Sequence, residues 1–394
     1  MKTNSANTVV TLLALALLGT TLAAQQTTAP VQAKSDDTTT TLASSPAVAR
    51  QDSHEGPSEA LASVPPGNAN HRITLDVVVA DRSGHALAGL QQQDFTLLDD
   101  KQPQKIVSFH AVAGASATAD PPVEVILVVD EVNTSFRNVE IERQQIQKLL
   151  SQNGGELVRP VSIVFFSDAG ATIRNTPSRD GKTLIADLNQ NKNALRTSGR
   201  AQGFYGAVDR LNLSLRALGQ LADYEAARPG RKLVVWISPG WPLFSGPNVE
   251  LSSKDQQQLF NSIVAVSDEL RRARITLYDV DPLGMEDEVG VRTSYYKDFV
   301  KGVSAARQVR VGNLALQVLA YQSGGLVLNS NNDVAGEIAT CIADANAFYV
   351  LSFDGAVGDA PNEYHALEIK IDKPGLAART RSGYYAQPER VRTP

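Results

Sequence analysis

Cysteine is almost absent from this chain, because only one, Cys341, occurs among 394 residues. A single cysteine excludes an intramolecular disulfide, and it excludes zinc sites built from several cysteines. By helical spacing Cys341 shares one face with Val334, Ile338, Ile342 and Ala345. We therefore expect it to be packed in a core and to have no chemical role.

Histidine is also scarce, and no two histidines have the spacing that a metal site requires. The five residues are His54, His71, His85, His110 and His365. The sequence lacks the Gly-x-Ser-x-Gly motif of a nucleophilic serine, and no Ser-His-Asp arrangement can be proposed. The sequence therefore predicts a protein without enzymatic activity, and an unrecognised hydrolase is the alternative from another class.

Charge of one sign is not in large excess, since the net charge is −5 and the basic residues are scattered. This balance gives no electrostatic basis for binding nucleic acid. With 42% hydrophobic and 20% charged residues, the chain is expected to form packed cores.

Long hydrophobic runs are missing too, and the N-terminal run Val9–Leu18 is too short to span a bilayer comfortably. It follows the basic start Met1-Lys2 and precedes the small residues of Leu22-Ala23-Ala24. This order is typical of a signal peptide, so residues 1–24 predict export to the periplasm or the cell exterior. A membrane anchor is the alternative reading; no membrane span is expected after cleavage.

The flanks of the chain have the composition of connecting segments. Residues 25–70 are rich in Thr, Ser, Ala, Gln and Pro without an apolar period, which predicts a disordered linker. Residues 387–394 are predicted to be a tail.

Two groups of β-branched, alternating segments predict small β modules over residues 71–113 and 346–386. The predicted strands are Arg72–Asp81, Asp94–Leu98, Lys105–Val112, Phe348–Phe353, Tyr364–Ile371 and Leu376–Arg381. Each group has too few strands for independent stability. We therefore expect the two groups to pack as one β-sandwich, with the intervening domain inserted between them.

Between these groups, over residues 121–345, apolar runs alternate with helical patterns. The predicted strands are Val123–Val129, Val161–Phe166, Leu233–Ser238, Ile275–Val280 and Gly325–Leu328. Continuous apolar strands are buried on both faces, so the pattern predicts an α/β fold with a Rossmann-like, doubly wound and mostly parallel sheet. The polar stretch from Gly284 to Gly312 is left open as an extra helix or a lid over the sheet edge.

The stretch Val123–Ser135 combines a buried strand with an acidic, hydroxyl-bearing loop that starts at Asp130. In open α/β sheets, ligands bind just beyond the carboxyl ends of the strands. Asp168 and the pair Asp279 and Asp281 follow other predicted strands and are expected at the same edge.

Three segments of the chain resemble a known family. They are Val77–Ile106, the Asp130 strand and loop together with Pro229–Gly240 and Arg274–Gly284, and Phe348–Asp354 with Lys373–Ala386. Together they are similar to the von Willebrand factor A-related (VWFA) domain proteins of the acidobacterial type. The resemblance implies export and an A-domain, a module usually devoted to adhesion or protein contact. It implies no known substrate or catalytic residue.

The resemblance also implies a place for Mg²⁺ or Ca²⁺, held in such domains by Asp-x-Ser-x-Ser, a Thr and an Asp from three loops. Here Asp130 and Thr134 match in kind, but Val132 cannot bind an ion. Gln202 stands where the Thr is expected, and Pro239 where the Asp is expected. We therefore expect a degenerate metal site and no cofactor.

The leading hypothesis is that the chain binds a protein or cell-surface partner through this edge without a metal. The expected contact residues are Asp130, Asn133, Thr134, Ser135, Asp168, Gln202, Pro239 and Trp241. Trp241 is either an exposed contact residue or folded back over the sheet edge. The alternative is adhesion that depends on Mg²⁺ or Ca²⁺ at a modified site with Asp130 and Thr134, or with Asp168, Asp279 and Asp281.

Overall fold

The computed structural model describes residues 71–113, 123–173, 176–191, 204–242, 251–282, 296–329 and 331–389. The predicted signal peptide, the predicted linker, Gln202 and residues 390–394 lie outside these described residues. Within the described part, no helix combines the length and the apolar character that crossing a bilayer requires.

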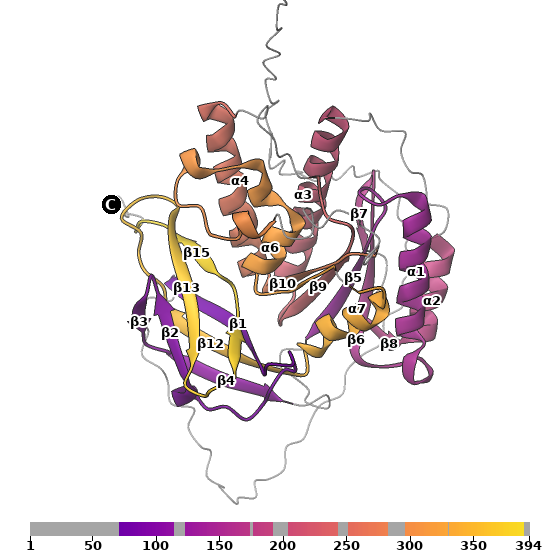
Figure 1. The fold of residues 1–394 in the computed structure, drawn as a ribbon, viewed down its shortest axis with the longest axis horizontal. Coiled ribbons are helices and arrows are strands. Elements are labelled where there is room, and N and C mark those ends of the chain that lie inside the picture. Colours follow the sequence, from indigo (N-terminus) through magenta and orange to yellow (C-terminus); the bar gives the residue numbers. More distant parts are fainter. Residues whose placement is uncertain are drawn as a thin grey trace, which may run out of the picture. The chain divides into compact units, whose positions relative to one another are not determined.

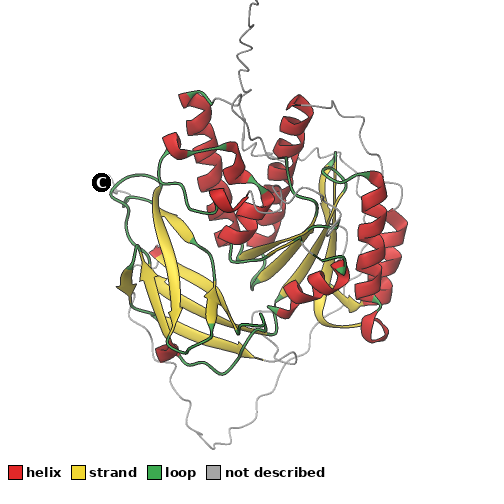
Figure 2. Ribbon diagram, in the orientation of Figure 1, coloured by secondary structure: helices red, strands yellow, loops and turns green. Residues whose placement is uncertain are grey.

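The larger sheet is mixed and mostly parallel (Figures 1 and 2). Its strand order is β11-β10-β9-β5-β6-β7, and β8 also pairs with β6. Strands β7 and β8 run antiparallel to β6, whereas the other pairs are parallel. The strands are β5 (Glu124–Asp130), β6 (Glu156–Ser167), β7 (Gly170–Ile173), β8 (Ser178–Asp180), β9 (Lys232–Ile237), β10 (Ile275–Val280) and β11 (Val327–Leu328).

Helices pack against both faces of this sheet, because successive strand residues point to opposite sides. In β5, Ile126 and Val128 belong to one core, and Leu127 and Val129 belong to the other. The helices of the first core are α3 (Phe204–Ala226), α4 (Ser253–Arg272) and α6 (Leu316–Gln322). Those of the second are α1 (Phe136–Leu150), α2 (Gly181–Gln190) and α7 (Val334–Ala343), where Cys341 is fully buried as expected.

Two four-stranded sheets form a β-sandwich beside this α/β part (Figure 1). Their strand orders are β14-β1-β12-β4 and β15-β13-β2-β3. The strands are β1 (Arg72–Ala80), β2 (Phe95–Asp99), β3 (Gln102–Gln104), β4 (Ser108–Ala113), β12 (Ala347–Asp354), β13 (Glu363–Ile371), β14 (Ala377–Arg379) and β15 (Gly383–Ala386).

Strands from before and after the α/β part pair with each other in both sheets of the sandwich. Strand β12 lies between β1 and β4, and β13 pairs with β2, all antiparallel. Their inward side chains, among them Leu75, Leu97, Leu351 and Phe353, share one core. Neither group of strands could bury its apolar face alone.

The described part of the polar stretch before Gly312 contains short 3-10 helices. They are η6 (Tyr296–Phe299), η7 (Ala306–Gln308) and η8 (Val311–Leu314), which extends just beyond the stretch. Val303, Val309 and Val311 are buried in the first core beside α4. This part of the stretch is therefore packed into the domain.

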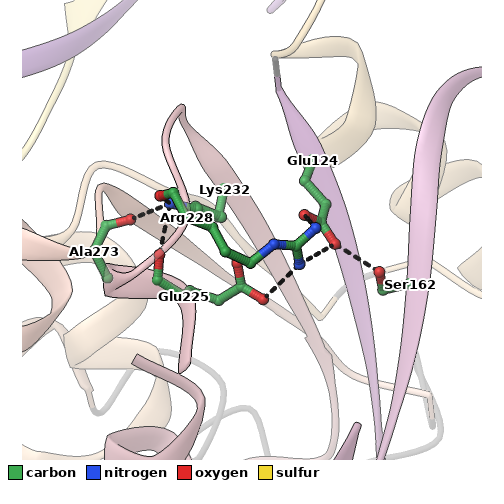
Figure 3. A network of polar contacts seen from close by, with 6 residues as sticks. All are labelled: Glu124, Ser162, Glu225, Arg228, Lys232 and Ala273. Atoms are coloured by element: carbon green, nitrogen blue, oxygen red, sulfur yellow. Dashed lines mark hydrogen bonds and ion pairs between the residues drawn. The ribbon is translucent and has the colours of Figure 1, made fainter. Parts of the chain in front are cut away.

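The edge of the sheet where the parallel strands begin carries buried charges that are paired (Figure 3). Arg228 contacts both Glu124 and Glu225, with nitrogen–oxygen distances of 2.9 and 3.3 Å. The Lys232 ammonium donates hydrogen bonds to the carbonyl oxygens of Glu225, Arg228 and Ala273. Buried charges need such partners, and this edge supplies them.

Candidate functional site

The opposite edge, where the parallel strands end, carries the loop predicted from sequence. Asp130 is the last residue of β5, and Ser135 is the N-cap of α1. The Ser135 hydroxyl accepts a hydrogen bond from the backbone N–H of Asn138 at 3.4 Å. The loop between them is therefore held by a strand end at one side and a helix cap at the other.

Asp130 is fully buried, and protein donors hold both of its carboxylate oxygens. Oδ1 accepts the backbone N–H groups of Val132 at 2.9 Å and Asn133 at 2.8 Å. Oδ2 accepts the Asn133 side-chain amide and the indole N–H of Trp236, both at 2.9 Å. Burial raises the pKa of Asp130, and these hydrogen bonds act in the opposite direction.

The same loop is fixed to its surroundings by three further contacts. The Asn133 amide also donates to the Ser214 hydroxyl in α3, at 2.9 Å. The backbone N–H of Glu131 donates to the carbonyl of Phe166 at 2.9 Å. Arg143 Nη2 lies 3.3 Å from Glu131 Oε1. The loop is therefore held to α3, to the end of β6 and to α1 by these contacts.

Next to Asp130 lie buried oxygens that make no hydrogen bond of standard geometry among the described residues. They belong to the Thr134 hydroxyl and to both carboxyl oxygens of Glu142 in α1. Burial raises the pKa of Glu142 well above its usual range. The nearby carboxyls of Asp130, Glu131 and Asp281 add to this rise, whereas the Thr134 hydroxyl opposes it.

Asp279, in β10, adds to this acidic edge. It is buried, and neither carboxyl oxygen makes a hydrogen bond of standard geometry among the described residues, although Gln317 lies close to it. Burial raises its pKa well above the usual range, and Asp281 adds to the rise. Arg143 pairs with one acid at this edge, Glu131. The edge therefore carries an excess of buried carboxyl groups, in contrast to the opposite edge.

Asp130 and the positions of Val132 and Pro239 fit a metal ion less well than the neighbouring pair Glu142 and Thr134. Each Asp130 carboxylate oxygen already accepts two hydrogen bonds, and neither the Val132 nor the Pro239 side chain has a ligand atom. Glu142 and Thr134 offer hard oxygen atoms of the kind that Mg²⁺ and Ca²⁺ prefer. However, among the described residues no three carboxylates at this edge bring ligand atoms within 4.8 Å of one another.

Trp241 is folded back over the sheet edge, which is one of the two arrangements considered from sequence. It is 3% exposed, and its ring packs edge-on against Trp236 with centroids 5.2 Å apart. Asp130 and Thr134 are buried as well. These three residues are therefore not presented to a partner in this structure.

The other predicted contact residues reach solvent to different degrees. Ser135 and Asp168 are exposed, and Asn133 and Pro239 are half-buried. Sequence reasoning assigned Trp236 only to the core and missed its bond to Asp130. The sequence signal that could have indicated this bond is chemical: the indole N–H of a tryptophan in a buried strand needs a hydrogen-bond acceptor.

Comparison with known proteins gives weak structural similarities. No family model and no curated protein matches this chain. The chain is similar to the pilus adhesin SpaC from Lactobacillus rhamnosus GG, with 8% identity and a TM-score of 0.33 over 75% of this chain and 49% of the adhesin. It therefore spans about half the length of that adhesin.

Two isolated domains are also similar to this chain. For the SpRpn10 VWA domain the identity is 11% and the TM-score 0.29, over 60% of this chain and 99% of that domain. For the TFIIH p34 N-terminal domain the identity is 13% and the TM-score 0.27, over 57% and 99%. At these TM-scores the functional argument rests on the geometry of this chain.

Proposed function

We propose that this chain is an exported, non-enzymatic interaction protein built on a doubly wound, Rossmann-like von Willebrand factor A-type domain. It binds a protein or cell-surface partner at the edge that carries the Asp130 loop, and it does so without a divalent ion. The support is a mostly parallel sheet with helices on both faces and a rigid loop at the strand ends.

One observation carries the proposed metal independence. All four hydrogen bonds to the Asp130 carboxylate come from the protein, and Trp236 supplies one of them from a neighbouring strand. An ion bound here would need lone pairs of the Asp130 oxygens that already accept hydrogen bonds from those donors. We infer that these bonds order the loop. The contact surface is formed by the exposed residues Ser135, in this loop, and Asp168, after β6, together with Asn133 and Pro239.

Capture of partners from the native envelope fraction tests this proposal. The full chain should retain the same partner in EDTA and in MgCl₂. Asp168→Lys should reduce capture, because it reverses a charge on the proposed surface. Asp372→Lys is the matched control, since Asp372 is exposed on the β-sandwich and should leave capture unchanged. Capture that disappears in EDTA would contradict metal independence.

A second candidate is cation-dependent adhesion through a modified site. The buried oxygens of Thr134 and Glu142 favour it, because they make no hydrogen bond of standard geometry among the described residues and an ion would coordinate them. In that case Mg²⁺ or Ca²⁺ raises the thermal midpoint of the wild type, and Glu142→Gln abolishes the rise. Equal thermal midpoints with and without the ions would contradict cation-dependent adhesion and leave metal-independent binding as the remaining candidate.

A further inference from the structure

The β-sandwich contains a second group of polar side chains, far from the Asp130 edge in the fold. Asp99 ends β2, Asp100 follows in the turn to β3, and His365 lies on the adjacent strand β13. One ligand atom from each of the three lies within 4.8 Å of the others. His365 Nδ1 is 3.0 Å from Asp99 Oδ1 and 3.4 Å from Asp100 Oδ2.

These spacings match those of ligands around a single ion. Atoms bound at about 2.1 Å to one ion lie about 3.0–3.4 Å apart in octahedral or tetrahedral geometry. Three such atoms leave further coordination positions for water. Asp100 supplies the open side, because its side chain is 53% exposed, whereas the side chains of Asp99 and His365 are largely buried.

The remaining polar atoms of both aspartates are held by other groups. The Tyr384 hydroxyl donates to Asp99 Oδ2 at 2.7 Å, and its ring stacks on the His365 ring with centroids 5.1 Å apart. The backbone N–H of Ala366 donates to Asp100 Oδ1 at 2.9 Å. Such outer contacts orient metal ligands in proteins, and here they leave Asp99 Oδ1 and Asp100 Oδ2 facing His365 Nδ1.

Charge balance points in the same direction. Among the described residues, no lysine or arginine pairs with Asp99 or Asp100, and His365 is the partner of both. A divalent ion would add positive charge beside the buried carboxylate of Asp99.

We propose that Asp99, Asp100 and His365 bind one divalent transition-metal ion, of which Zn²⁺ is the reference. An imidazole nitrogen with two carboxylate oxygens suits Zn²⁺ better than Mg²⁺ or Ca²⁺, which prefer oxygen ligands alone. The ion joins the β2–β3 hairpin to β13, and therefore joins strands from the two ends of the domain. This site is independent of the proposed function.

Calorimetric titration of the full chain with ZnCl₂ tests the site. The wild type should bind one Zn²⁺ per chain, and MgCl₂ at the same concentration should not compete. His365→Gln and Asp100→Asn should each weaken zinc binding at least about tenfold, because each removes a ligand. Asp100→Asn is the sharper variant, since asparagine tolerates the φ of 47° at this turn and still accepts the Ala366 N–H.

His85→Gln is the control, because His85 lies 3.8 Å from Asp81 on the surface and forms an unrelated His-Asp pair. Its zinc affinity should equal that of the wild type. Thermal unfolding in EDTA should show that all variants are folded. Absence of zinc binding by the wild type, wild-type affinity in either ligand variant, or loss of affinity in His85→Gln would overturn the proposal. Absence of binding would leave a hydrogen-bonded His-Asp group without a metal.

Discussion

At the scale of single residues, the Asp130 carboxylate depends on a small number of donors. Removing one donor leaves a buried oxygen short of a hydrogen bond, which is costly for a charged group. Trp236 provides the donor that lies farthest from Asp130 along the chain. It is therefore the residue whose replacement tests the arrangement most cleanly.

Trp236→Phe should destabilise the protein more than Trp241→Phe. Both indoles are buried and pack against each other, but the indole N–H of Trp241 has no hydrogen-bond partner among the described residues. The difference should be about 1.5–3 kcal/mol, the usual contribution of a hydrogen bond to a charged group. Urea unfolding followed by circular dichroism measures it. Equal losses in the two variants would show that the bond to Asp130 contributes nothing.

Glu142 should make stability fall as the pH rises. Burial raises its pKa in the folded protein, whereas the unfolded chain releases the proton near the ordinary value of 4.5. Between these two values the folded state holds more protons, so the free energy of unfolding decreases with increasing pH. The free energy of unfolding of Glu142→Gln should therefore be higher than that of the wild type at pH 7.

That advantage should shrink as the pH falls toward 4.5 and should be absent below 4.5, where both states of the wild type hold the proton. Urea unfolding in EDTA from pH 4 to 8 follows the difference. Glu140→Gln is the control for the same substitution at a less buried position of this helix. A constant difference across this range would contradict the assignment.

The sequence alone predicts where Asp130 lies, because an apolar run followed by an acidic loop marks a strand end. It does not predict what holds the carboxylate. Trp236 and Asn133 meet Asp130 through tertiary contacts, and no spacing rule links residues 106 positions apart, as Asp130 and Trp236 are. The group of Asp99 and His365 was missed for the same reason, since 266 positions separate them.

At the scale of elements, β12 holds the β-sandwich together. It is the middle strand between β1 and β4, which come from the opposite end of the domain. Its side chains Leu351 and Phe353 enter the sandwich core, whereas Phe348 enters the second core of the α/β part. Loosening this strand should therefore affect segments more than 200 residues away in sequence.

Leu351→Ala should lower the free energy of unfolding by about 2–5 kcal/mol, because Leu351 is fully buried. Hydrogen exchange should become faster in β1 and β4 as well as in β12, since these strands share its hydrogen bonds. Val357→Ala is the control, because Val357 is 41% exposed. Faster exchange confined to the C-terminal strands would contradict this role of β12.

Strand counting predicts that the two groups of strands share one sandwich, since neither group can stand alone. The exact pairing is not predictable in this way, because register depends on side-chain contacts between distant segments. The sequence predicts no strand between Asp94–Leu98 and Lys105–Val112. The left-handed φ angles of Asp100 and Lys101 instead form a tight hairpin, which adds the short strand β3.

At the scale of the whole domain, Asp344 connects the sandwich to the α/β part. Its carboxylate accepts hydrogen bonds from Arg379 of β14, at 2.8 and 3.0 Å, and from the Tyr278 hydroxyl of β10, at 2.7 Å. Its backbone carbonyl accepts a hydrogen bond from Arg231 at 2.9 Å. Because Asp344 is buried, these contacts are shielded from water.

Asp344→Asn should lower the free energy of unfolding by about 2–4 kcal/mol, because it leaves the mostly buried Arg379 without its counter-charge. Asp354→Asn is the matched control. It breaks the more exposed pair with Arg72 and should cost less than about 1 kcal/mol. Urea unfolding followed by circular dichroism measures both. A loss for Asp344→Asn no larger than for the control would show that this connection is energetically minor.

The most direct test of metal-independent binding is calorimetry of MgCl₂ into the full chain, for the wild type and for Asp130→Asn. Protein donors already hold both Asp130 oxygens, so we predict no binding heat from either protein. We also predict that the wild type captures the same partner in EDTA as in MgCl₂. Binding heat from the wild type that disappears in Asp130→Asn would contradict the account.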